Sequence, residues 1–335
     1  MSGKKVILIA EAGVNHNGDF SRAIELIDAA AESGADYIKF QTFKAKNIAI
    51  NSASLAAYQR QNVSEPNQQS MLEKLELDYS WHQKLIDHAS LRSIKFMTSP
   101  FDLCSAKFVA SLDLETIKIP SGEITNLPLL RFLGGLNKKI IMSTGMATVG
   151  EIDNALRVLY VSGTSKENIT VLHCTTDYPA HIRDVNLRAM KTLQLCFDVS
   201  VGYSDHTEGI AVAIAAAALG ASVIEKHLTL DRNLPGPDHC ASIEPNDFAQ
   251  LVKSVRQVEL ALGAATKVPT KSELDNRSVV RKSLVAKMDI NKGDVFTLKN
   301  LTVKRPGKGI SPMLIDELLG KKAIKKFHKD DLIEW

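Results

Sequence analysis

The sequence predicts an α/β protein, a (β/α)8 TIM barrel followed by a small C-terminal domain. Three observations favour this fold. Short β-type runs alternate with helical patterns between residues 6 and 260, eight such runs occur, and the sequence pattern afterwards changes to that of a small β-rich domain. The runs are Val6–Ala10, Tyr37–Gln41, Lys95–Thr98, Thr116–Ile119, Lys139–Ser143, Thr170–His173, Val199–Gly202 and Ser222–Glu225. Eight strands, each followed by a helix, are the repeat of the barrel fold.

The segments between these runs have helical periodicity. In Ser21–Ser33 the apolar residues Ala23, Ile27 and Ala31 recur at helical spacing, and Gly34 follows as a stop signal. The pattern also occurs in Ser80–Leu91, Ser105–Leu112, Leu127–Gly134, Val149–Val161 and Leu187–Gln194. A doubly wound open sheet is the alternative fold. It normally carries a glycine-rich turn after the first strand, and Glu11–Gly18 does not fit GxGxxG.

The connection from Phe43 to Tyr79 is much longer than the others and is rich in glutamine and asparagine. Loops of this length in compact domains are usually functional or disordered. Apolar residues within it could anchor it against the barrel: Leu55, Tyr58, Met71, Leu72 and Leu75. We therefore predict a lid or rim segment rather than disorder.

A domain boundary is expected near GAATKVPTKSELDN (263–276), a polar stretch that contains Pro269. We assign residues 1–265 to the barrel, 266–280 to a linker and 281–335 to a small β-rich domain. In this domain, Met313–Leu319 followed by Gly320 predicts a short helix. The domain has 13 Lys and Arg against 7 Asp and Glu, a charge of +6, which could help to attract a small anion. Most of these lysines are expected on a solvated surface.

Composition excludes several function classes. Of the 335 residues, 44% are hydrophobic and 24% are charged, which are values typical of a soluble globular protein. The net charge of +3 gives no case for a nucleic-acid partner. No apolar run approaches the length of a membrane span, and the N-terminal run is too short for a signal peptide. Four scattered cysteines without a CxxC pair indicate free thiols and a reducing compartment, so we expect a cytoplasmic protein without a membrane partner.

Two histidines, His206 and His227, follow predicted strands on either side of an alanine-rich helix, Ile210–Leu219. If the strands are parallel neighbours, both imidazoles emerge at the end of the sheet where such enzymes place their chemistry. Neutral imidazole is a good ligand for a divalent transition metal. Three nearby acidic residues could add oxygen ligands or act as bases: Asp205, Glu225 and Asp238.

Polar residues also end the other predicted strands, and packing alone does not explain them. Lys118 with several hydroxyls would form a phosphate cradle, because lysine supplies charge while hydroxyls and backbone N–H groups supply donors. The hydroxyls are those of Ser121, Ser143 and Ser204. Each serine taken singly could instead be a turn or helix-cap residue.

Four carboxylates are candidates for proton transfer and for binding sugar hydroxyls: Glu11, Glu123, Glu225 and Asp238. A salt bridge with a strand-end lysine is the competing interpretation, above all for Glu225 beside Lys226. His16 and His173 are expected to be hydrogen-bonded residues of the barrel mouth rather than metal ligands.

These residues stand in motifs that resemble the sialic acid synthase family, enzymes that condense phosphoenolpyruvate with an N-acylated aldose to form a nonulosonic acid. The matching stretches are AEAGVNHNG (10–18), KFQTFKA (39–45), IKIPSGEITNLPLL (117–130), STGMAT (143–148), LHCTTDYP (172–179), GYSDHT (202–207), IEKHLTLD (224–231), GPDH (236–239) and KRPGKGISP (304–312). The resemblance covers essentially the whole chain. It implies a barrel followed by an antifreeze-like (SAF) domain, and a domain-swapped homodimer.

Carried over by motif, the resemblance also implies roles for single residues. His206 and His227 would bind a catalytic divalent ion, typically Mn²⁺, with Mg²⁺ or Co²⁺ as substitutes. The phosphoenolpyruvate pocket would comprise Lys118, Ser121, Ser143, Thr176 and Ser204. The sugar side would comprise Lys39, Gln41, Glu123, Tyr178 and Asp238, with Arg305 delivered across the dimer to the N-acyl group. Glu11, Glu123 or Glu225 would stabilise the developing cation or activate the water that traps it.

The sugar is inferred from finer features of the motifs. HCTTDYP, VGYSDHT and PSGEITNLP are most similar to N,N′-diacetyllegionaminate synthases, which use 2,4-diacetamido-2,4,6-trideoxymannose. N-acetylneuraminate synthases, which use N-acetylmannosamine, are the second possibility and share GPDH. Two other classes remain open: a metal-dependent aldolase that releases no phosphate, and a catalytically idle protein whose terminal module binds a partner.

Overall fold

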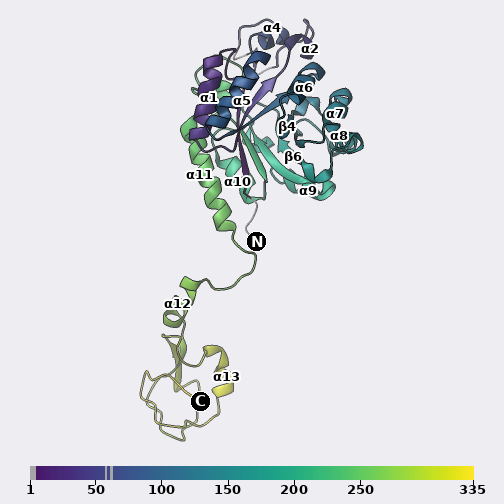
Figure 1. Ribbon diagram of the computed structural model, residues 1–335. Coiled ribbons are helices and arrows are strands. Elements are labelled where there is room, and N and C mark those ends of the chain that lie inside the picture. Colours follow the sequence, from purple (N-terminus) through teal and green to yellow (C-terminus); the bar gives the residue numbers. More distant parts are fainter. Residues whose placement is uncertain (1–4, 57–58, 61–62) are drawn as a thin grey trace. The chain divides into compact units, whose positions relative to one another are not determined.

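The computed structural model describes residues 5–56, 59–60 and 63–335 (Figure 1). The chain folds into two compact units that divide after Gly263, and each unit has its own hydrophobic core. Among the described residues, no helix is both long and apolar enough to cross a membrane.

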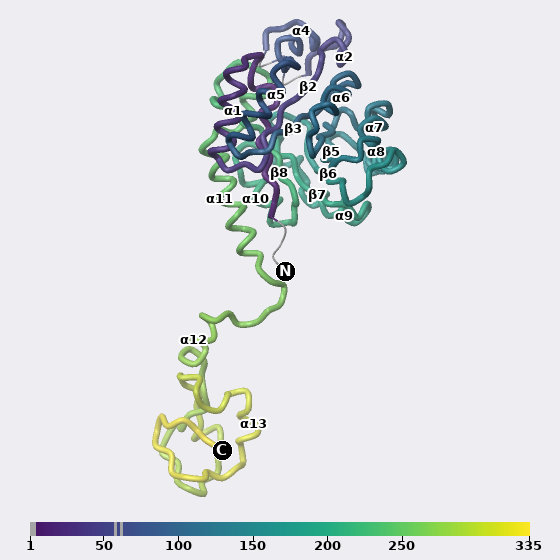
Figure 2. Tube along the Cα trace, in the orientation of Figure 1, coloured from purple at the N-terminus to yellow at the C-terminus, as the bar shows by residue number. Residues whose placement is uncertain are grey.

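The first unit is a nearly closed barrel of eight parallel strands surrounded by helices, which confirms the predicted fold (Figure 2). The strand order is β3-β2-β1-β8-β7-β6-β5-β4. The strands are β1 (Ile7–Gly13), β2 (Tyr37–Thr42), β3 (Lys95–Pro100), β4 (Thr116–Ile119), β5 (Lys139–Ser143), β6 (Ile169–Cys174), β7 (Ser200–Asp205) and β8 (Val223–His227). Each overlaps one of the eight predicted runs.

The helices of the barrel follow the predicted periodicity. They are α1 (Phe20–Glu32), α5 (His82–Leu91), α6 (Leu103–Ala110), α7 (Leu127–Gly134), α8 (Val149–Ser162), α9 (Ala189–Phe197), α10 (Ala211–Ala218) and α11 (Pro245–Leu262). In α1 the Asp19 side chain caps the first turn by accepting from the backbone N–H groups of Ser21 and Arg22. The helix then buries the apolar stripe formed by Ala23, Leu26, Ile27 and Ala30.

Strand β1 runs three residues further than the sequence predicts. Its continuation, Glu11–Gly13, contains polar and glycine positions that do not look like a buried strand, but both neighbours support it. Glu11 is in register with Lys39 of β2 and with His227 of β8, and the register shifts between Glu11 and Gly13. Gly13 has a φ of +53°, a conformation that glycine adopts without strain. Tertiary pairing therefore extends the strand into the polar residues.

An apolar layer inside the barrel separates its two ends. Successive strand residues alternate between the interior and the helices. One set of inward-facing residues packs into a buried cluster: Ile9, Tyr37, Met97, Ile141, Leu172 and Val223. We call the end of the barrel beyond the C-termini of the strands the C-terminal mouth, and the opposite end the N-terminal mouth.

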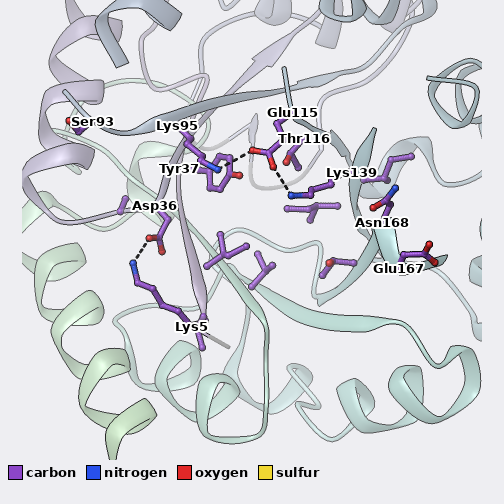
Figure 3. Close-up of a pocket in the computed structure, with 17 residues that line it drawn as sticks. Lys5, Asp36, Tyr37, Ser93, Lys95, Glu115, Thr116, Lys139, Glu167 and Asn168 are labelled. Carbon is purple, nitrogen blue, oxygen red and sulfur yellow. Dashed lines mark hydrogen bonds and ion pairs between the residues drawn. The ribbon is translucent and has the colours of Figure 1, made fainter. Parts of the chain in front are cut away.

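The N-terminal mouth contains a cavity of about 470 Å³ (Figure 3). Its three lysines form ion pairs with two of its carboxylates. The Nζ atoms of Lys95 and Lys139 lie 3.0 and 2.5 Å from the two carboxylate oxygens of Glu115. Lys5 Nζ lies 2.6 Å from Asp36 Oδ1. These pairs are partly exposed to solvent, and residues at this face of a barrel generally serve stability rather than catalysis.

The long connection after β2 is anchored on the barrel as predicted. It contains two short helices, α2 (Ala45–Ile48) and α4 (Gln68–Glu73). An apolar cluster holds it in place: Val14, Phe43, Leu55, Met71 and Leu75 are buried, and Ile48, Val63, Leu72 and Phe101 pack against them. Tyr58, another predicted anchor, lies outside the described residues.

The second unit contains a helix, α12 (Lys271–Val280), and a two-stranded antiparallel sheet of β9 (Ser283–Ala286) and β10 (Leu301–Lys304). The short helix α13 (Ile315–Leu318) ends before Gly320, whose φ is +85°, in agreement with the predicted stop signal. The core of this unit includes Leu284, Ala286, Ile290, Phe296, Phe327 and Ile333. Helix α12 was not predicted, although its capping box, Thr270 with Glu273, is visible in the sequence.

Candidate active site

A cavity of about 390 Å³ opens at the C-terminal mouth and brings together every predicted site residue except Arg305. The predicted residues that line it are Glu11, Lys39, Gln41, Lys118, Ser121, Glu123, Ser143, Thr176, Tyr178, Ser204, His206, Glu225, His227 and Asp238. The cavity at the N-terminal mouth is larger, but its lysines are already paired with carboxylates at the surface. The buried polar residues, rather than the volume, therefore identify the candidate site.

Strand register accounts for the positions of the central residues. Glu11 is the register partner of both Lys39 and His227, on the two strands that flank β1. Ser204 of β7 is the partner of Glu225 of β8. Because residues two apart on a strand face the same side, Glu225 and His227 both point into the barrel.

Two lysines and two carboxylates form a buried charge cluster on the cavity floor. Lys39 Nζ lies 3.2 Å from Glu11 Oε2 and 3.1 Å from Glu225 Oε2. Lys118 Nζ lies 3.5 Å from Glu225 Oε1. All four side chains are at most 4% exposed. Charges this deeply buried are costly unless they are paired, so their presence indicates a function other than packing.

The two carboxylates of this cluster differ in pKa. Burial raises the pKa of Glu11 to about 7, against the opposing effect of Lys39. Burial acts in the same direction on Glu225, but Lys118 and Lys39 together outweigh it and hold the pKa of Glu225 well below its usual range. Burial lowers the pKa of Lys118 to about 8. Near neutral pH the cluster therefore gains positive charge when Glu11 binds a proton, and this favours a bound anion.

His206 and His227 lie side by side with ring centroids 5.5 Å apart. His206 Nδ1 lies 2.6 Å from the carbonyl oxygen of Thr175, which can only accept, so Nδ1 carries the proton and Nε2 keeps its lone pair. Burial lowers the pKa of His206 to about 4 and also lowers that of His227, so both rings are neutral near pH 7. The Tyr178 ring packs 4.2 Å from that of His206.

The donor set of this pair fits a divalent transition metal. Neutral imidazole is a preferred ligand, and His227 Nδ1 is buried without a hydrogen-bond partner in the described part of the chain. Asp238 Oδ2 is 3.9 Å from that nitrogen. Among the described residues, no group of three or more His, Cys, Asp or Glu is placed to hold an ion. Two protein ligands would leave coordination positions for water and substrate, as catalytic sites require.

Small residues and hydroxyls form the part of the cavity that adjoins β4, β5 and β6. The Gly145 N–H donates to Ser121 Oγ at 2.9 Å, and Ser121 Oγ lies 3.3 Å from Cys174 Sγ. A Cβ on Gly145 would overlap Thr176 Oγ1 and come within 3.0 Å of Ser121 Oγ. Ser143 Oγ is buried without a hydrogen-bond partner among the described residues. These donors and Lys118, which lines the same cavity, match the chemistry of a phosphate group.

Ser204 lines the same cavity and is in register with Cys174. Its Oγ donates to Glu225 Oε1 at 3.0 Å and is 3.3 Å from His206 Nε2. Ser204 therefore connects the hydroxyl-lined pocket with the imidazole pair and the charge cluster.

Glu225 forms salt bridges with two strand-end lysines, as the competing interpretation held, but these are Lys39 and Lys118 and not Lys226. Lys226 and Asp205 are fully buried on the opposite face of the sheet, and Lys226 Nζ lies 2.8 Å from Asp205 Oδ2. Asp205 also accepts from the backbone N–H and the hydroxyl group of Thr207. It is therefore not available as a metal ligand or base, and the expectation that it could be one is wrong. Successive side chains of a strand point to opposite faces of the sheet. Glu225 therefore points into the barrel, where it meets Lys39 and Lys118, while Lys226 points away from it and meets Asp205.

Polar groups of the sugar-side set converge near β1. Gln41 Nε2 donates to Glu11 Oε1 at 3.2 Å. A Cβ on Gly13 would lie 3.3 Å from Gln41 Nε2 and 3.6 Å from Asp238 Oδ2, so glycine makes room for both. Burial raises the pKa of Asp238 to about 6. Across the mouth, burial also raises the pKa of Glu123, whose Oε2 accepts from Asn126 Nδ2 at 2.6 Å.

The remaining histidines and Arg305 have other surroundings. His173 Nε2 bonds to the carbonyl of Val185, and His16 Nδ1 accepts from the Gly18 N–H. Both are therefore hydrogen-bonded residues, as expected. Arg305 belongs to the second unit, where its Nε donates to the carbonyl of Val280 at 3.0 Å.

Several lining residues were not among the predicted site residues. Cys174, Ser99, Val14 and Phe101 stand at or directly after strand ends, so their position alone is a signal for them. The apolar lining residues Ile48, Met71, Leu72 and Leu75 carry no such signal, because only folding of the long connection over the mouth brings them there. The four cysteines are all described, and all are free thiols, as expected.

Comparison with known proteins places the chain in a family. Residues 26–267 match the model of the NeuB family, and residues 281–335 match that of the SAF domain. The chain belongs to the NeuB family. It is 54% identical over 331 residues to an N,N′-diacetyllegionaminic acid synthase of Campylobacter jejuni subsp. jejuni serotype O:2, covering 98% of this chain and 99% of the relative.

Two further relatives span most of this NeuB-family chain. An N,N′-diacetyllegionaminic acid synthase of Legionella pneumophila subsp. pneumophila is 43% identical, with 100% of this chain and 95% of the relative covered. The crystal structure of an N-acetylneuraminic acid (sialic acid) synthetase from Leptospira borgpetersenii serovar Hardjo-bovis, in complex with citrate, superposes with a TM-score of 0.73. That comparison has 31% identity and covers 81% of this chain and 90% of the other.

Proposed function

We propose that this chain condenses phosphoenolpyruvate with 2,4-diacetamido-2,4,6-trideoxymannose and water, giving N,N′-diacetyllegionaminic acid and inorganic phosphate. The single observation that carries the proposal is the cavity at the C-terminal mouth. There a floor of two lysines and two carboxylates adjoins a hydroxyl-lined pocket and a neutral imidazole pair. The lysines and the hydroxyl-lined pocket suit a phosphorylated enol, and the imidazole pair suits a metal that activates a carbonyl. The 54% identity to a legionaminic acid synthase supports this choice of sugar.

The residues at the phosphate side bind and orient phosphoenolpyruvate. Lys118, Ser121, Ser143, Thr176 and the Gly145 N–H hold the phosphate, and Lys39 lies close enough to attract the carboxylate. Binding places C3 of the enol toward the imidazole pair, where the sugar aldehyde carbon is held. The enol attacks this carbon and forms the new carbon–carbon bond, which leaves positive charge at C2.

The buried carboxylates then act on the charged intermediate. Glu225, which is ionised, stabilises the cation at C2. Water adds to C2 with loss of a proton, and Glu11, whose pKa is about 7, can accept that proton. The resulting tetrahedral carbon loses phosphate by cleavage of the C–O bond, which yields the keto acid.

We further propose that His206 and His227 hold a divalent ion, Mn²⁺ in the first instance and Mg²⁺ or Co²⁺ as substitutes. When bound, such an ion supplies Lewis-acid polarisation of the aldehyde oxygen. The residues of the chain fit this role through their neutral imidazoles and the unpartnered Nδ1 of His227.

Arg305 has a separate place in the proposal. It lies in the SAF domain rather than among the residues that line the cavity. We propose a domain-swapped homodimer in which Arg305 of the second chain contacts the N-acyl group of the sugar. The barrel, in this proposal, works in the cytoplasm.

A phosphate-release assay tests the proposed function. The purified chain is incubated with Mn²⁺, phosphoenolpyruvate and either 2,4-diacetamido-2,4,6-trideoxymannose or N-acetylmannosamine, and both inorganic phosphate and the nonulosonic acid are measured. We expect equimolar phosphate and product, faster with the diacetamido sugar, and no release without a sugar. Faster turnover of N-acetylmannosamine would favour the N-acetylneuraminate alternative. Carbon–carbon bond formation or cleavage without phosphate would indicate an aldolase, and no reaction would contradict the proposal.

A further inference from the structure

The strand order arranges the parts of the cavity in a definite sequence. The hydroxyl-lined pocket adjoins β4, β5 and β6, and the imidazole pair follows β7 and β8. Next around the barrel come β1, β2 and β3, over which the long connection with α2 and α4 is anchored. A sugar whose aldehyde lies at the imidazole pair and whose reacting face is turned to the phosphate side can extend its far end toward this last region.

The lining changes character there. We call the residues Val14, Ile48, Met71, Leu72, Leu75 and Phe101 the distal wall; all six are apolar and all line the cavity. Met71 and Leu75 are only 3% and 6% exposed and serve mainly to anchor the connection. Ile48, Leu72 and Phe101 are half-buried, so they present surface that a ligand can contact.

Charged groups of the same connection are kept away from this wall. Lys44 pairs with Glu76 at 2.7 Å, and Lys74 pairs with Glu65 at 2.5 Å, and none of these four lines the cavity among the described residues. The described connection contributes two polar side chains to the cavity, Gln59 and Gln68, and Gln59 Oε1 accepts from the Ala56 N–H. The six side chains of the distal wall themselves offer no hydrogen-bonding group to a hydroxyl.

The polar sugar contacts lie on the other side of this boundary. Glu11, Gln41 and Asp238 converge beside Gly13, between the imidazole pair and the distal wall. Apart from the charge cluster, which reaches β1 and β2 through Glu11 and Lys39, the lining thus changes from hydroxyls and imidazoles, through polar groups, to apolar side chains.

From this gradient we infer that the distal wall, through Leu72 and Ile48, recognises the deoxygenated C6 methyl end of the acceptor sugar and selects against a C6 hydroxyl. The inference rests on the proposed function, since it assigns one end of the proposed substrate to a wall of the same cavity. A hydroxyl placed there loses its water without gaining a partner, whereas a methyl group gains apolar contact.

The test compares two acceptors that differ only at C6: 2,4-diacetamido-2,4,6-trideoxymannose and its 6-hydroxy counterpart. We expect the wild-type chain to favour the 6-deoxy sugar in kcat/KM by about tenfold or more, the usual size of such discrimination. In Leu72→Gln, which keeps the volume but adds an amide, the ratio should fall by about tenfold. This fall in the ratio should come from a lower kcat/KM for the 6-deoxy sugar rather than from a higher kcat/KM for the 6-hydroxy sugar.

Two further variants keep the result interpretable. Ile50→Gln alters an exposed residue of the same connection that does not line the cavity, and its preference should equal that of the wild type. Ile48→Thr changes the wall from a different helix, so it tests the inference if Leu72→Gln does not fold, and its ratio should also fall.

The outcomes separate the inference from the function on which it rests. The inference would be overturned if both wall variants kept the wild-type ratio of kcat/KM for the two sugars, or if the wild type preferred the 6-hydroxy sugar. Phosphate release by the wild type would in that case still support the proposed function. Absence of phosphate release from the wild-type chain with either sugar would overturn the proposed function itself.

Discussion

The two mouths of the barrel use the same residue types in opposite ways. At the N-terminal mouth Lys95 and Lys139 share Glu115, and the three side chains are 49–61% exposed. At the C-terminal mouth Lys39 and Lys118 share Glu225, and all are at most 4% exposed. Water screens the first group, so its pairing is worth little free energy. The second group is desolvated, so small changes in charge have large effects.

This contrast explains why the larger cavity is not the candidate active site. Hydrogen bonds from Lys139 and Lys95 lower the pKa of Glu115 to about 2, as in an ordinary surface pair. At the C-terminal mouth burial raises the pKa of Glu11 to about 7 and lowers that of Lys118 to about 8, which brings both near the working pH. Groups that change protonation state near neutral pH are characteristic of catalytic sites.

The largest expected effect concerns the buried Lys226–Asp205 pair, which joins β7 and β8 near the C-terminal mouth on the face of the sheet turned away from the cavity. Lys226→Met leaves Asp205 as a fully buried charge without its partner, so the free energy of unfolding should fall by about 3–5 kcal/mol. At the other mouth Lys95→Met should cost less than about 1 kcal/mol. Urea denaturation of the two variants measures the difference, and equal losses would erase the contrast. The double variant Asp205→Leu with Lys226→Met should recover most of the stability.

Lys118 and Lys139 offer a matched comparison of function. They stand on adjacent strands, but Lys118 lines the candidate site and Lys139 lines the N-terminal mouth. Lys118→Met should lower kcat/KM for phosphoenolpyruvate by about 10²–10³, the usual cost of losing one preorganised electrostatic contact. Lys139→Met should leave the kinetics unchanged. Comparable losses from both substitutions in steady-state assays would show that the mouths do not differ in this way.

A smaller effect is expected at the glycine turn of the phosphate side. Gly145→Ala places a Cβ against Thr176 Oγ1 and Ser121 Oγ, which must move. We expect KM for phosphoenolpyruvate to rise by about tenfold, because misplaced donors bind phosphate less well. Gly150→Ala is the control, since its Cβ would meet open space and Gly150 does not line the cavity. An unchanged KM in Gly145→Ala would argue against phosphate binding at this turn.

The smallest effect is a difference in the sign of pH dependence. Glu115 has a lowered folded pKa, so its ionic contribution is present above its unfolded pKa and is lost as the pH falls toward about 2. Glu123 has a pKa raised by burial, so its charge opposes folding as the pH rises above its unfolded pKa. At pH 7 Glu115→Gln should lower the melting temperature slightly and Glu123→Gln should raise it. Both differences should shrink toward pH 4, and shifts of the same sign would contradict the assignment.

The sequence predicted the fold because alternation and helical periodicity are local signals. Residues such as Lys39 and Lys118 could be assigned to the C-terminal mouth for the same reason, since a strand end is local information. The direction of each side chain is also fixed by the alternation, yet Asp205 was assigned to the wrong face. Strand β7 extends three residues beyond the predicted run and ends at Asp205, and the face to which each of these side chains turns is known only once the register is known.

Other features depend on contacts that a sequence does not display. Leu72 and Ile48 reach the cavity only because the connection after β2 packs over the mouth. The pairing of Lys226 with Asp205, and of Lys39 with two carboxylates, follows from the order of the strands around the barrel. Helix α12 has a visible capping box but buries no apolar residue, so periodicity gave no signal for it.

The most direct test of the account is a Mn²⁺ titration followed by electron paramagnetic resonance. We predict that the wild-type chain binds one Mn²⁺ per barrel and that His206→Ala and His227→Ala each lose this binding together with turnover. His173→Ala, whose imidazole is bonded to the carbonyl of Val185, should still bind the ion. Retention of Mn²⁺ with full activity in His206→Ala would contradict the claim that these two imidazoles form the metal site of the C-terminal mouth.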